Sequence, residues 1–372
     1  MTKLKILFIF GTRPEAIKMA PIIKECEKQK ENCEYKVCVT GQHKEMLEQV
    51  LSFFSIKTDF DLSLMQHDQT LFDITARALK GIELVLTDFL ADVVLVQGDT
   101  TTAMAGALAG YYKKIKVGHV EAGLRSGNMY SPFPEEINRK IVSTVTHFHF
   151  APTKRAKENL EQENYTANIY VTGNTVIDAL LWGVQQVRTS KAFANNFSFL
   201  NKEKKLILVT AHRRESFGRE FENICIALLT IAKNNPGFEI VYPVHLNPNV
   251  QSIVRKSLSG HPNIHLIEPV GYPELIWLMD KSYLVLTDSG GIQEEAPTLG
   301  KPVLVMRNVT ERQEGVDSGT ALLVGTDEQK IVNETQKLID DEEAYEKMAR
   351  AVNPYGDGTA SSQILSILLN QN

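Results

Sequence analysis

The feature of the sequence that most constrains its fold is a regular alternation of short apolar runs with helix-like stretches. Several of the runs are apolar at consecutive positions, as expected of strands buried on both faces. Strands that alternate with helices predict parallel sheets joined by right-handed crossovers. The sequence therefore predicts an α/β fold of doubly wound parallel sheets. We place the strands at residues 4–10, 35–40, 93–96, 116–120, 148–151, 169–172, 206–210, 239–244, 264–267, 284–287 and 303–305.

The chain is long enough for two such domains. Its 372 residues exceed the limit of about 250–300 residues at which a single hydrophobic core stops growing. A helix-like stretch at 176–187 is followed by a polar segment at 189–205, which we interpret as linker or surface. We predict an N-terminal domain at 1–172 and a C-terminal domain at 173–356. Because open parallel sheets bind ligands outside the carboxyl ends of their strands, we expect the site in a cleft between the domains.

Composition and charge exclude several classes of protein. The formal net charge is −5 at pH 7, so the chain has no overall basic field for binding nucleic acid. Every apolar run is shorter than the roughly 18–20 residues of a membrane span, and the first is too short for the core of a signal peptide. The four cysteines form no CxxC pair and have no metal-like spacing to histidine, which is typical of a reducing cytosol. We expect a cytoplasmic protein with no metal site and no nucleic-acid or membrane partner.

The first predicted strand leads into a turn with the sequence Gly-Thr-Arg-Pro-Glu at residues 11–15. Glycine permits a tight turn, and proline is favoured in the first turn of a helix. The free backbone amides of such a helix, with Arg13 and Lys18 nearby in the sequence, form an anion site that suits phosphate. The alternative is an ordinary connection from strand to helix with a solvated arginine.

Carboxylates follow two buried strands of the first half. Asp99 comes after the strand at 93–96 and Glu121 after the strand at 116–120, where parallel-sheet enzymes keep catalytic groups. Asp99 has an alternative role as a helix cap, because aspartate is favoured there. Glu121 is unfavourable both as a cap and in a strand. Glu135 begins a later helix, where the helix dipole alone also favours a carboxylate.

The second half carries basic residues at a corresponding place. His212 and Arg213 follow a predicted strand, and Arg214 comes next. Two adjacent arginines are expected to lower the pKa of His212, and the three side chains together suit a pyrophosphate. Another histidine after a strand, His245, has less support, and we interpret it as structural.

A second phosphate-type turn follows a later strand. It consists of Ser289, Gly290 and Gly291, whose backbone amides and hydroxyl can approach phosphate closely. Glu295 lies about one helical turn further on, where an acid can bind ribose hydroxyls, and Arg312 adds positive charge after the next strand. The alternative is that the glycines form only a tight turn.

The fingerprints of several well-known enzyme classes are missing from the sequence. It has no GxGxxG, no P-loop Gly-Lys-Ser/Thr, no GxSxG and no HExxH, which removes the best support for nicotinamide, ATP and zinc-protease functions. Acids gather in the first half and phosphate-type motifs in the second. This distribution favours a nucleotide bound by the C-terminal domain and a sugar presented to carboxylates of the N-terminal domain.

Six motifs in order carry a family resemblance: FGTRPEAIK at 10–18, GDT at 98–100, HVEAGLR at 119–125, PFPEEINR at 132–139, AHRRE at 211–215 and TDSGGIQEE at 287–295. They resemble the non-hydrolysing UDP-N-acetylglucosamine 2-epimerases over nearly the whole chain. The resemblance implies a GT-B-like fold with two Rossmann-like domains and a C-terminal helix, at about 357–372, that packs back on the N-terminal domain. It implies a cytosolic homodimer without cofactors that makes UDP-N-acetylmannosamine for surface polysaccharide. We expect UDP elimination and re-addition through a 2-acetamidoglucal intermediate.

The resemblance also implies roles for matching residues. Asp99, Glu121 and Glu135 match the catalytic carboxylates, and His212 matches a histidine of the catalytic site. The residues that match contacts to substrate or UDP are Arg13, Lys18, Ser289, Gly290, Gly291, Glu295 and Arg312, with Val270 and Leu275 where the family contacts uracil. We add Arg213 to the UDP-binding set.

The sequence departs from the family at two places. Gln97 stands where many members have histidine before Gly-Asp. Some Gram-positive members bind a second substrate molecule as an activator, and the residues that fall in that pocket are Gln42, His43, Glu45, Asp68 and Gln69. Glu45 and Asp68 replace a glutamine and an arginine, which disfavours such activation here.

Three alternatives stay open. A hydrolysing epimerase releases UDP and free N-acetylmannosamine, but those relatives usually continue Gly-Thr-Arg with Ala, Glu or Asp, Tyr and Gly, whereas this chain has Pro14, Glu15 and Ala16. A GT-B glycosyltransferase shares the architecture and transfers the sugar to an acceptor. A nucleotide-sugar sensor without catalysis is disfavoured because all three carboxylates are present.

Overall fold

The computed structural model describes all residues except 1–2, 42–43, 65–68, 214–217 and 372. Its contacts divide the chain into two compact units. Unit 1 comprises Met1–Ala179 and Tyr355–Asn372, and unit 2 comprises Leu180–Pro354. The chain passes from unit 1 to unit 2 after Ala179 and returns after Pro354, and the boundaries at 172/173 and 356/357 stay predictions. No described helix is long and apolar enough to cross a membrane.

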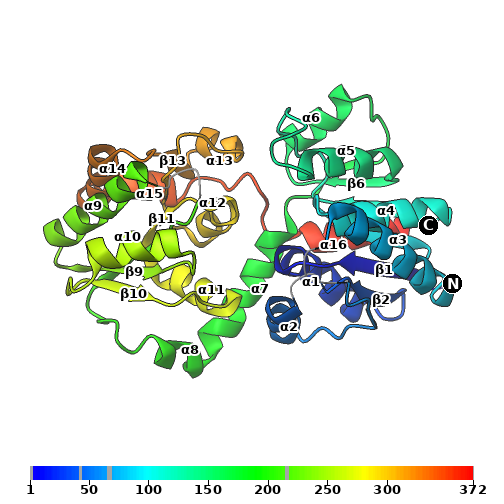
Figure 1. The fold of residues 1–372 in the computed structure, drawn as a ribbon, viewed down its shortest axis with the longest axis horizontal. Coiled ribbons are helices and arrows are strands. Elements are labelled where there is room, and N and C mark those ends of the chain that lie inside the picture. Colours follow the sequence, from blue (N-terminus) through cyan, green and yellow to red (C-terminus); the bar gives the residue numbers. More distant parts are fainter. Residues whose placement is uncertain (1–2, 42–43, 65–68, 214–217, 372) are drawn as a thin grey trace. The chain divides into compact units, whose positions relative to one another are not determined.

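Unit 1 is built on a parallel sheet of seven strands in the order β3-β2-β1-β4-β5-β6-β7. The strands are β1 (Leu4–Phe10), β2 (Cys33–Val39), β3 (Phe60–Asp61), β4 (Val93–Gln97), β5 (Lys116–Val120), β6 (Phe148–Ala151) and β7 (Ile169–Val171). Its helices are α1 (Arg13–Lys28), α2 (Lys44–Phe53), α3 (Leu71–Asp88), α4 (Thr101–Tyr112), α5 (Glu135–Val145), α6 (Lys154–Gln162), the start of α7 (Thr175–Thr189), and α16 (Ala360–Asn370). The C-terminal helix α16 contacts α1 (Figure 1).

Unit 2 is built on a parallel sheet of six strands in the order β10-β9-β8-β11-β12-β13 (Figure 1). The strands are β8 (Lys205–Thr210), β9 (Phe238–Pro243), β10 (Ile264–Ile267), β11 (Ser282–Thr287), β12 (Val303–Val305) and β13 (Ala321–Leu323). The helices after α7 are α8 (Lys191–Asn196), α9 (Arg219–Asn234), α10 (Pro248–Leu258), α11 (Tyr272–Lys281), α12 (Gly290–Glu295), α13 (Gln313–Asp317), α14 (Glu328–Asp340) and α15 (Glu342–Ala349).

The two sheets have the same topology, and the predicted fold class is confirmed. In each unit the first strand lies between the second and the fourth, which is the doubly wound order of Rossmann-like domains. Ligands of such sheets bind outside the carboxyl ends of the strands, where the order reverses. This position is the end of β1 and β4 in unit 1, and the end of β8 and β11 in unit 2.

The central strands are stabilised by burial of apolar side chains on both faces of the sheet. Ile6, Phe8 and Phe10 on β1 have no exposed surface, and neither have Leu7 and Ile9, which point to the other face. Burial of such apolar side chains stabilises the fold by about 1.5–3 kcal/mol each. Unit 2 has an equivalent core of buried aliphatic residues from its central strands and from α9, α10 and α14.

Three elements were absent from the sequence-based prediction. The strands β3 and β13, at the edges of their sheets, have only two and three residues. The segment predicted as linker or surface contains α8, none of whose residues is buried. β3 carries no continuous apolar run, and the runs in α8 and β13 have only three residues each. The conformation of these elements depends on pairing or packing with the rest of the unit.

Candidate functional site

The turn after β1 is organised by a buried glutamate. Glu15 Oε2 accepts hydrogen bonds from the amides of Gly11 at 3.1 Å and Thr12 at 2.8 Å, and Oε1 accepts one from the Thr100 hydroxyl at 2.7 Å. Burial raises the pKa of Glu15, although these hydrogen bonds oppose the shift. A Cβ at Gly11 would lie 2.1 Å from Thr40 Oγ1, so the turn requires glycine. Glu15 therefore ties the turn after β1 to the turn after β4.

The carboxylate of Glu121 is surrounded by hydrogen-bond donors. Oε1 lies 2.5 Å from Lys18 Nζ and 3.0 Å from Asn174 Nδ2, and Oε2 accepts a hydrogen bond from Gln97 Nε2. Only 8% of Glu121 is exposed. Lys18, which the resemblance assigned to the substrate, pairs with a carboxylate in this structure. The donors come from α1, β4 and the start of α7, and they hold the carboxylate in one orientation.

The backbone around Glu121 also has an unusual conformation. Glu121 has φ +66°, in the left-handed region that non-glycine residues rarely adopt. A Cβ at Gly98 would lie 3.6 Å from Glu121 Oε2, so this carboxylate borders the turn after β4. His119 Nε2 is 2.7 Å from the Gly98 carbonyl oxygen and fixes the same turn. Burial lowers the pKa of His119 to about 4, which keeps the imidazole neutral near pH 7.

Asp99 is paired rather than used as a helix cap. The cap of α4 is Thr100, whose hydroxyl accepts a hydrogen bond from the Ala103 amide at 3.0 Å. Asp99 Oδ2 lies 2.6 Å from Arg139 Nη2, and Asn138 Nδ2 donates to the Asp99 carbonyl oxygen at 2.8 Å. Helix α5 is therefore attached to the turn after β4 by two side chains.

The two neighbouring acids at the start of α5 differ in their surroundings. Glu136 accepts hydrogen bonds from the amides of Ser126 and Gly127 and from Arg139. Burial alone would raise the pKa of Glu136, but these partners outweigh it and lower the pKa. Glu135 Oε2 is also buried, yet it has no hydrogen-bond partner among the described residues. Glu136 therefore stabilises the loop before α5, whereas one carboxylate oxygen of Glu135 has no hydrogen bond among the described residues.

In unit 2, His212 and Arg213 are attached to the turn after β11. Asp288 Oδ2 accepts hydrogen bonds from their backbone amides at 2.6 and 2.7 Å. His212 Nδ1 lies 3.4 Å from Asp288 Oδ1, and its ring stacks on His245 with centroids 5.2 Å apart. Burial is the main cause that lowers the pKa of His212, and the charge of Asp288 opposes it. The predicted direction is therefore found, but the charge of Arg213 makes the smallest contribution.

In the predicted phosphate-binding turn after β11, few side-chain atoms lie near the backbone amides of Gly290 and Gly291. The Ser289 amide donates to Thr287 Oγ1 at 2.9 Å. A Cβ at Gly290 would lie 3.3 Å from Arg312 Cζ, so the guanidinium borders this glycine. A Cβ at Gly291 would approach only Glu295 Oε1, at 3.4 Å. The two glycines therefore leave their backbone accessible to a ligand group beside a cation.

Acidic partners hold the two arginines of this region. Arg312 Nε lies 2.8 Å from Glu294 Oε1, and Arg307 Nη1 lies 2.9 Å from Glu311 Oε2. Burial would raise the pKa of Glu311, but hydrogen bonding to Arg307 outweighs it and lowers the pKa to about 2. Arg307 is only 3% exposed.

The other predicted contacts of unit 2 lie on neighbouring elements. Glu295 is at the end of α12, and its Oε2 accepts a hydrogen bond from the Tyr272 hydroxyl at 3.1 Å. Val270 lies between β10 and α11, and Leu275 lies within α11, both half-buried. In unit 1, Arg13 is the first residue of α1 and is half-buried.

Part of the predicted activator pocket cannot be placed. Gln42, His43 and Asp68 lie outside the described residues. Glu45 is exposed in the first turn of α2, and Gln69 is half-buried shortly before α3. Elsewhere, the described side chains include no group of three or more His, Cys, Asp or Glu that could hold a metal ion.

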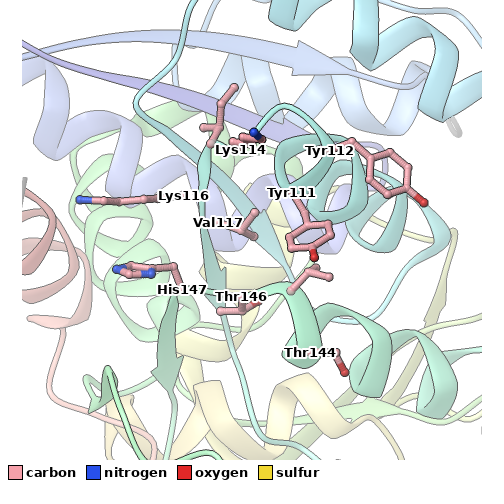
Figure 2. A pocket seen from close by; sticks show the side chains of 10 residues that line it. Tyr111, Tyr112, Lys114, Lys116, Val117, Thr144, Thr146 and His147 are labelled. Atoms are coloured by element: carbon pink, nitrogen blue, oxygen red, sulfur yellow. The ribbon is translucent and has the colours of Figure 1, made fainter.

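A cavity of about 620 Å³ in unit 1 lies away from these residues (Figure 2). It is lined by Lys116 and Val117 at the start of β5, by Tyr111 and Tyr112 at the end of α4, and by His147 just before β6. This is the amino edge of the parallel sheet, opposite to the edge where such folds bind ligands. The catalytic carboxylates predicted from the sequence all lie at the carboxyl edge.

Four residues of these networks were not assigned by the sequence. Asn174, Arg139 and Asp288 each contact a predicted site residue, and His245, interpreted as structural, stacks on His212. Asp288 follows a strand directly and offered a positional signal. The contacts of Asn174 and Arg139 join residues 53 and 40 positions apart in the chain and have no such signal.

Comparison with known proteins gives a consistent result. A family model described as UDP-N-acetylglucosamine 2-epimerase matches residues 24–369. The UDP-N-acetylglucosamine 2-epimerase of Escherichia coli K12 is 55% identical over 372 residues, covering 99% of each chain. The crystal structure of UDP-GlcNAc 2-epimerase from Neisseria meningitidis bound to UDP-GlcNAc is 50% identical, with a TM-score of 0.90 over 99% of this chain and 100% of that one. The wall teichoic acid polymerase TagF, at 13% identity and a TM-score of 0.60, shares the fold alone.

Proposed function

The chain belongs to the UDP-N-acetylglucosamine 2-epimerase family, and from this premise we propose that it is the non-hydrolysing, reversible enzyme. It converts UDP-N-acetylglucosamine to UDP-N-acetylmannosamine and releases neither free sugar nor UDP as a net product. The observation that carries this proposal is the buried, oriented carboxylate of Glu121 beside the turn of Asp99. The relative from Neisseria meningitidis, crystallised with UDP-GlcNAc, supports the choice of substrate.

The chemistry explains why carboxylates and a good leaving group suffice. No carbonyl acidifies the C2 hydrogen of the sugar. When the anomeric C1–O bond breaks, its electron pair leaves with UDP, and the positive charge that develops at C1 acidifies the C2 hydrogen. A carboxylate takes this proton, and a C1=C2 double bond forms to give a 2-acetamidoglucal. Protonation of C2 on the opposite face and return of UDP to C1 complete the epimerisation.

Unit 1 supplies the proton-transfer groups in this proposal. Glu121 is held in one orientation by three donors, and Glu135 has a buried oxygen without a hydrogen-bond partner among the described residues. Asp99 is fixed by Arg139 at 2.6 Å. We assign base, acid and electrostatic roles to these three carboxylates jointly. Lys18 then has a second role, because its positive charge pairs with the carboxylate of Glu121.

Unit 2 supplies the groups that bind UDP in this proposal. The amides around Gly290 and Gly291 and the guanidinium of Arg312 suit a diphosphate, since they stabilise the negative charge that develops as UDP departs. His212 and Arg213, oriented by Asp288, belong to the same set. Glu295, held by Tyr272, suits the ribose hydroxyls, and Val270 and Leu275 suit the uracil.

The test is the fate of the C2 hydrogen and of the glycosidic bond in heavy water. Purified protein is incubated with UDP-N-acetylglucosamine in D2O and followed by proton NMR. We expect deuterium at C2 of both epimers, with UDP-N-acetylmannosamine as product. Accumulation of UDP and free N-acetylmannosamine would instead identify a hydrolysing enzyme. Product that retains its C2 hydrogen would eliminate the elimination mechanism.

We also propose that the enzyme is a homodimer whose product supplies surface polysaccharide. The dimer is supported by the family resemblance and by large exposed side chains on the neighbouring helices α3 and α4. Phe72 is 87% exposed and Tyr112 is 67% exposed. Sedimentation equilibrium is expected to give twice the chain mass of 41.7 kDa, and a monomer at micromolar concentration would contradict the proposal.

A further inference from the structure

Two segments that connect unit 1 to unit 2 leave unit 1 at the same place. The outgoing connection begins with Gly173 and Asn174 before α7, and the returning one begins at Tyr355. The Asn174 amide donates a hydrogen bond to the Tyr355 carbonyl oxygen at 2.7 Å. A Cβ at Gly173, which has φ +87°, would lie 3.2 Å from Gly356 Cα, so close contact of the two backbones requires glycine there.

A second contact holds the same two segments together one turn later. Asp178 Oδ1 accepts hydrogen bonds from the Ser361 amide at 2.8 Å and from its hydroxyl at 2.5 Å. Asp178 is on α7 and Ser361 is in the first turn of α16, so the contact joins the outgoing helix to the returning one. Because this contact is made by other side chains than that of Asn174, Asp178 and Ser361 provide a structural reference for the same region.

The side chain of Asn174 connects this crossing to Glu121. Its Oδ1 accepts a hydrogen bond from the Val176 amide at 3.1 Å, which helps to start α7. Its Nδ2 donates to Glu121 Oε1 at 3.0 Å. Because the oxygen of the amide is used by the helix start, its nitrogen has to face the carboxylate. Asn174 is only 3% exposed, so solvent cannot easily replace either bond.

We propose that Asn174 is a positioning residue for the Glu121 carboxylate, linking the orientation of that carboxylate to the first turn of α7 and to the returning segment at Tyr355. The inference rests on the proposed epimerase function, in which Glu121 takes part in proton transfer at C2. Asn174 touches neither substrate nor reacting atoms in this proposal. It acts by fixing one oxygen of the carboxylate.

The chemistry of the three donors around Glu121 explains why an amide is useful at this position. Lys18 brings a positive charge to Oε1, whereas Asn174 orients the same oxygen without adding charge. Gln97 holds Oε2 from the opposite side of the carboxylate. A base needs its accepting lone pair aimed at the proton, and misplacement by a fraction of an ångström reduces the rate. Loss of the Asn174 donor would leave Glu121 held mainly by groups on α1 and β4.

Two substitutions of Asn174 remove the hydrogen bond to Glu121 while keeping an acceptor for the Val176 amide at the start of α7. Asn174→Asp keeps an oxygen for the Val176 amide but places a second carboxylate against Glu121. Asn174→Ser keeps a hydroxyl oxygen that can accept from the same amide and is too short to reach Glu121. Ser361→Ala is the matched control, because it removes a hydrogen bond to Asp178 at the same crossing and leaves the Asn174 side chain in place. Circular dichroism and thermal unfolding verify that each variant is folded.

The kinetic result expected is a fall in kcat with substrate binding retained. Loss of a hydrogen bond to a buried carboxylate is expected to lower kcat about 10- to 100-fold in Asn174→Ser, while KM and the Kd for UDP change less than about threefold. The acidic limb of the kcat profile moves to higher pH, because a donor that favours the ionised form is gone. It moves further in Asn174→Asp, where like charges oppose each other. Ser361→Ala keeps the kcat and the pH profile of the unchanged protein.

A readout besides activity is the titration of Glu121 itself. With glutamate labelled at the side-chain carboxyl carbon, the ¹³C signal of Glu121 is identified by its disappearance in Glu121→Gln. Its titration midpoint is expected to rise in Asn174→Ser and to stay unchanged in Ser361→Ala. This measurement tests whether Asn174 holds the Glu121 carboxylate, and it does not depend on enzyme activity. If the protein did not epimerise UDP-N-acetylglucosamine, only the proposed function would be contradicted.

Two outcomes would overturn the inference. The first is an unchanged midpoint and an unchanged kcat profile in both folded Asn174 variants. The second is an equal loss of kcat in Ser361→Ala, because the effect would then follow from loosening the crossing and not from the donor to Glu121.

Discussion

At the scale of single residues, the candidate site depends on charged groups removed from water. Glu121 combines a left-handed backbone with a nearly buried carboxylate. The backbone conformation alone costs about 1–2 kcal/mol in a residue with a Cβ, and it persists because Lys18, Gln97 and Asn174 fix the side chain. Strain of this kind is concentrated at functional sites. The buried histidines His119 on β5 and His149 on β6 make the stability of unit 1 depend on pH.

We predict that His149 makes unit 1 less stable in acid. Burial lowers the pKa of His149 to about 3, whereas the unfolded chain binds a proton near the ordinary pKa of about 6.5. The unfolded state therefore takes up more protons as the pH falls through 6.5, and the free energy of unfolding decreases by about 2 kcal/mol between pH 7.5 and pH 5 from this group. Urea unfolding of His149→Phe at both pH values should show a correspondingly smaller decrease. An identical decrease in both proteins would refute this.

At the scale of elements, the site is assembled by helices attached to turns at strand ends. Helix α5 is held against the turn after β4 by Arg139, which pairs with Asp99 and with Glu136. The turn after β11 is shaped by Asp288, which accepts hydrogen bonds from two amides after β8. In both units, one carboxylate joins the two strand ends at which the strand order reverses: Glu15 in unit 1 and Asp288 in unit 2. These attachments make two predictions about stability and binding.

Substitution of Arg139 is predicted to loosen helix α5. Arg139→Gln removes the partner of Glu136, which is 1% exposed, and of Asp99. Glu136 keeps the hydrogen bonds from the Ser126 and Gly127 amides but loses its positive partner, which should lower the free energy of unfolding by about 2–3 kcal/mol. The kcat should also fall because Asp99 loses its orientation. Arg350→Gln is the control, since Arg350 pairs with Glu346 at the surface and is 81% exposed. Equal stabilities of the two variants in denaturant titrations would contradict the prediction.

Gly291 is predicted to be required for UDP binding and not for folding. A Cβ at this position meets only Glu295 Oε1 at 3.4 Å, so Gly291→Ala should fold normally. The added methyl would lie over the backbone amides proposed to hold the diphosphate, and the Kd for UDP should rise at least about tenfold, or about 1.4 kcal/mol. Gly237→Ala, where a Cβ meets nothing within 4 Å, should keep the Kd unchanged. Isothermal titration calorimetry measures both, and equal affinities would disprove the assignment.

At the scale of the whole molecule, two units of the same topology divide the proposed work. Each has the doubly wound strand order and its own hydrophobic core. Unit 1 carries the candidate proton-transfer groups, and unit 2 carries the candidate diphosphate-binding groups. Both sets lie at the carboxyl edge of their own sheet, where the strand order reverses. This division predicts that mutations can reduce turnover without reducing UDP affinity.

Variants of unit 1 carboxylates are predicted to lose turnover and keep UDP affinity. Asp99→Asn and Glu121→Gln should lower kcat by about 10²–10⁴-fold, the range typical of general acid–base groups, while the Kd for UDP stays within about threefold. Glu158→Gln, an exposed acid of α6, serves as the control. Coupled measurement of turnover and calorimetric affinity tests the separation. Near-normal turnover in both variants would remove these residues from the chemistry.

Much of the fold was predictable because strand signals are local. The runs at β1, β5, β6, β10 and β12 were predicted with the bounds found in the structure. Consecutive apolar residues, as in β12 and most of β1, mark strands buried on both faces. The short edge strands β3 and β13 were not predictable, because a neighbouring strand supplies the hydrogen bonds that define them. Helix α8 was missed for a similar reason, because its polar sequence has no buried face.

The sequence by itself determined the fold class, the family and the positions of acids and glycines after the strands, because these depend on the order of residues along the chain. Only the tertiary structure decided what each group does: that Thr100 and not Asp99 caps α4, and that Asn174 faces Glu121. It also decided that Glu136 is hydrogen-bonded, whereas one oxygen of Glu135 has no partner in the described part of the chain. The physical reason is that hydrogen bonding and desolvation depend on distances in space. Residues far apart in the sequence set those distances when the sheet brings its strand ends together.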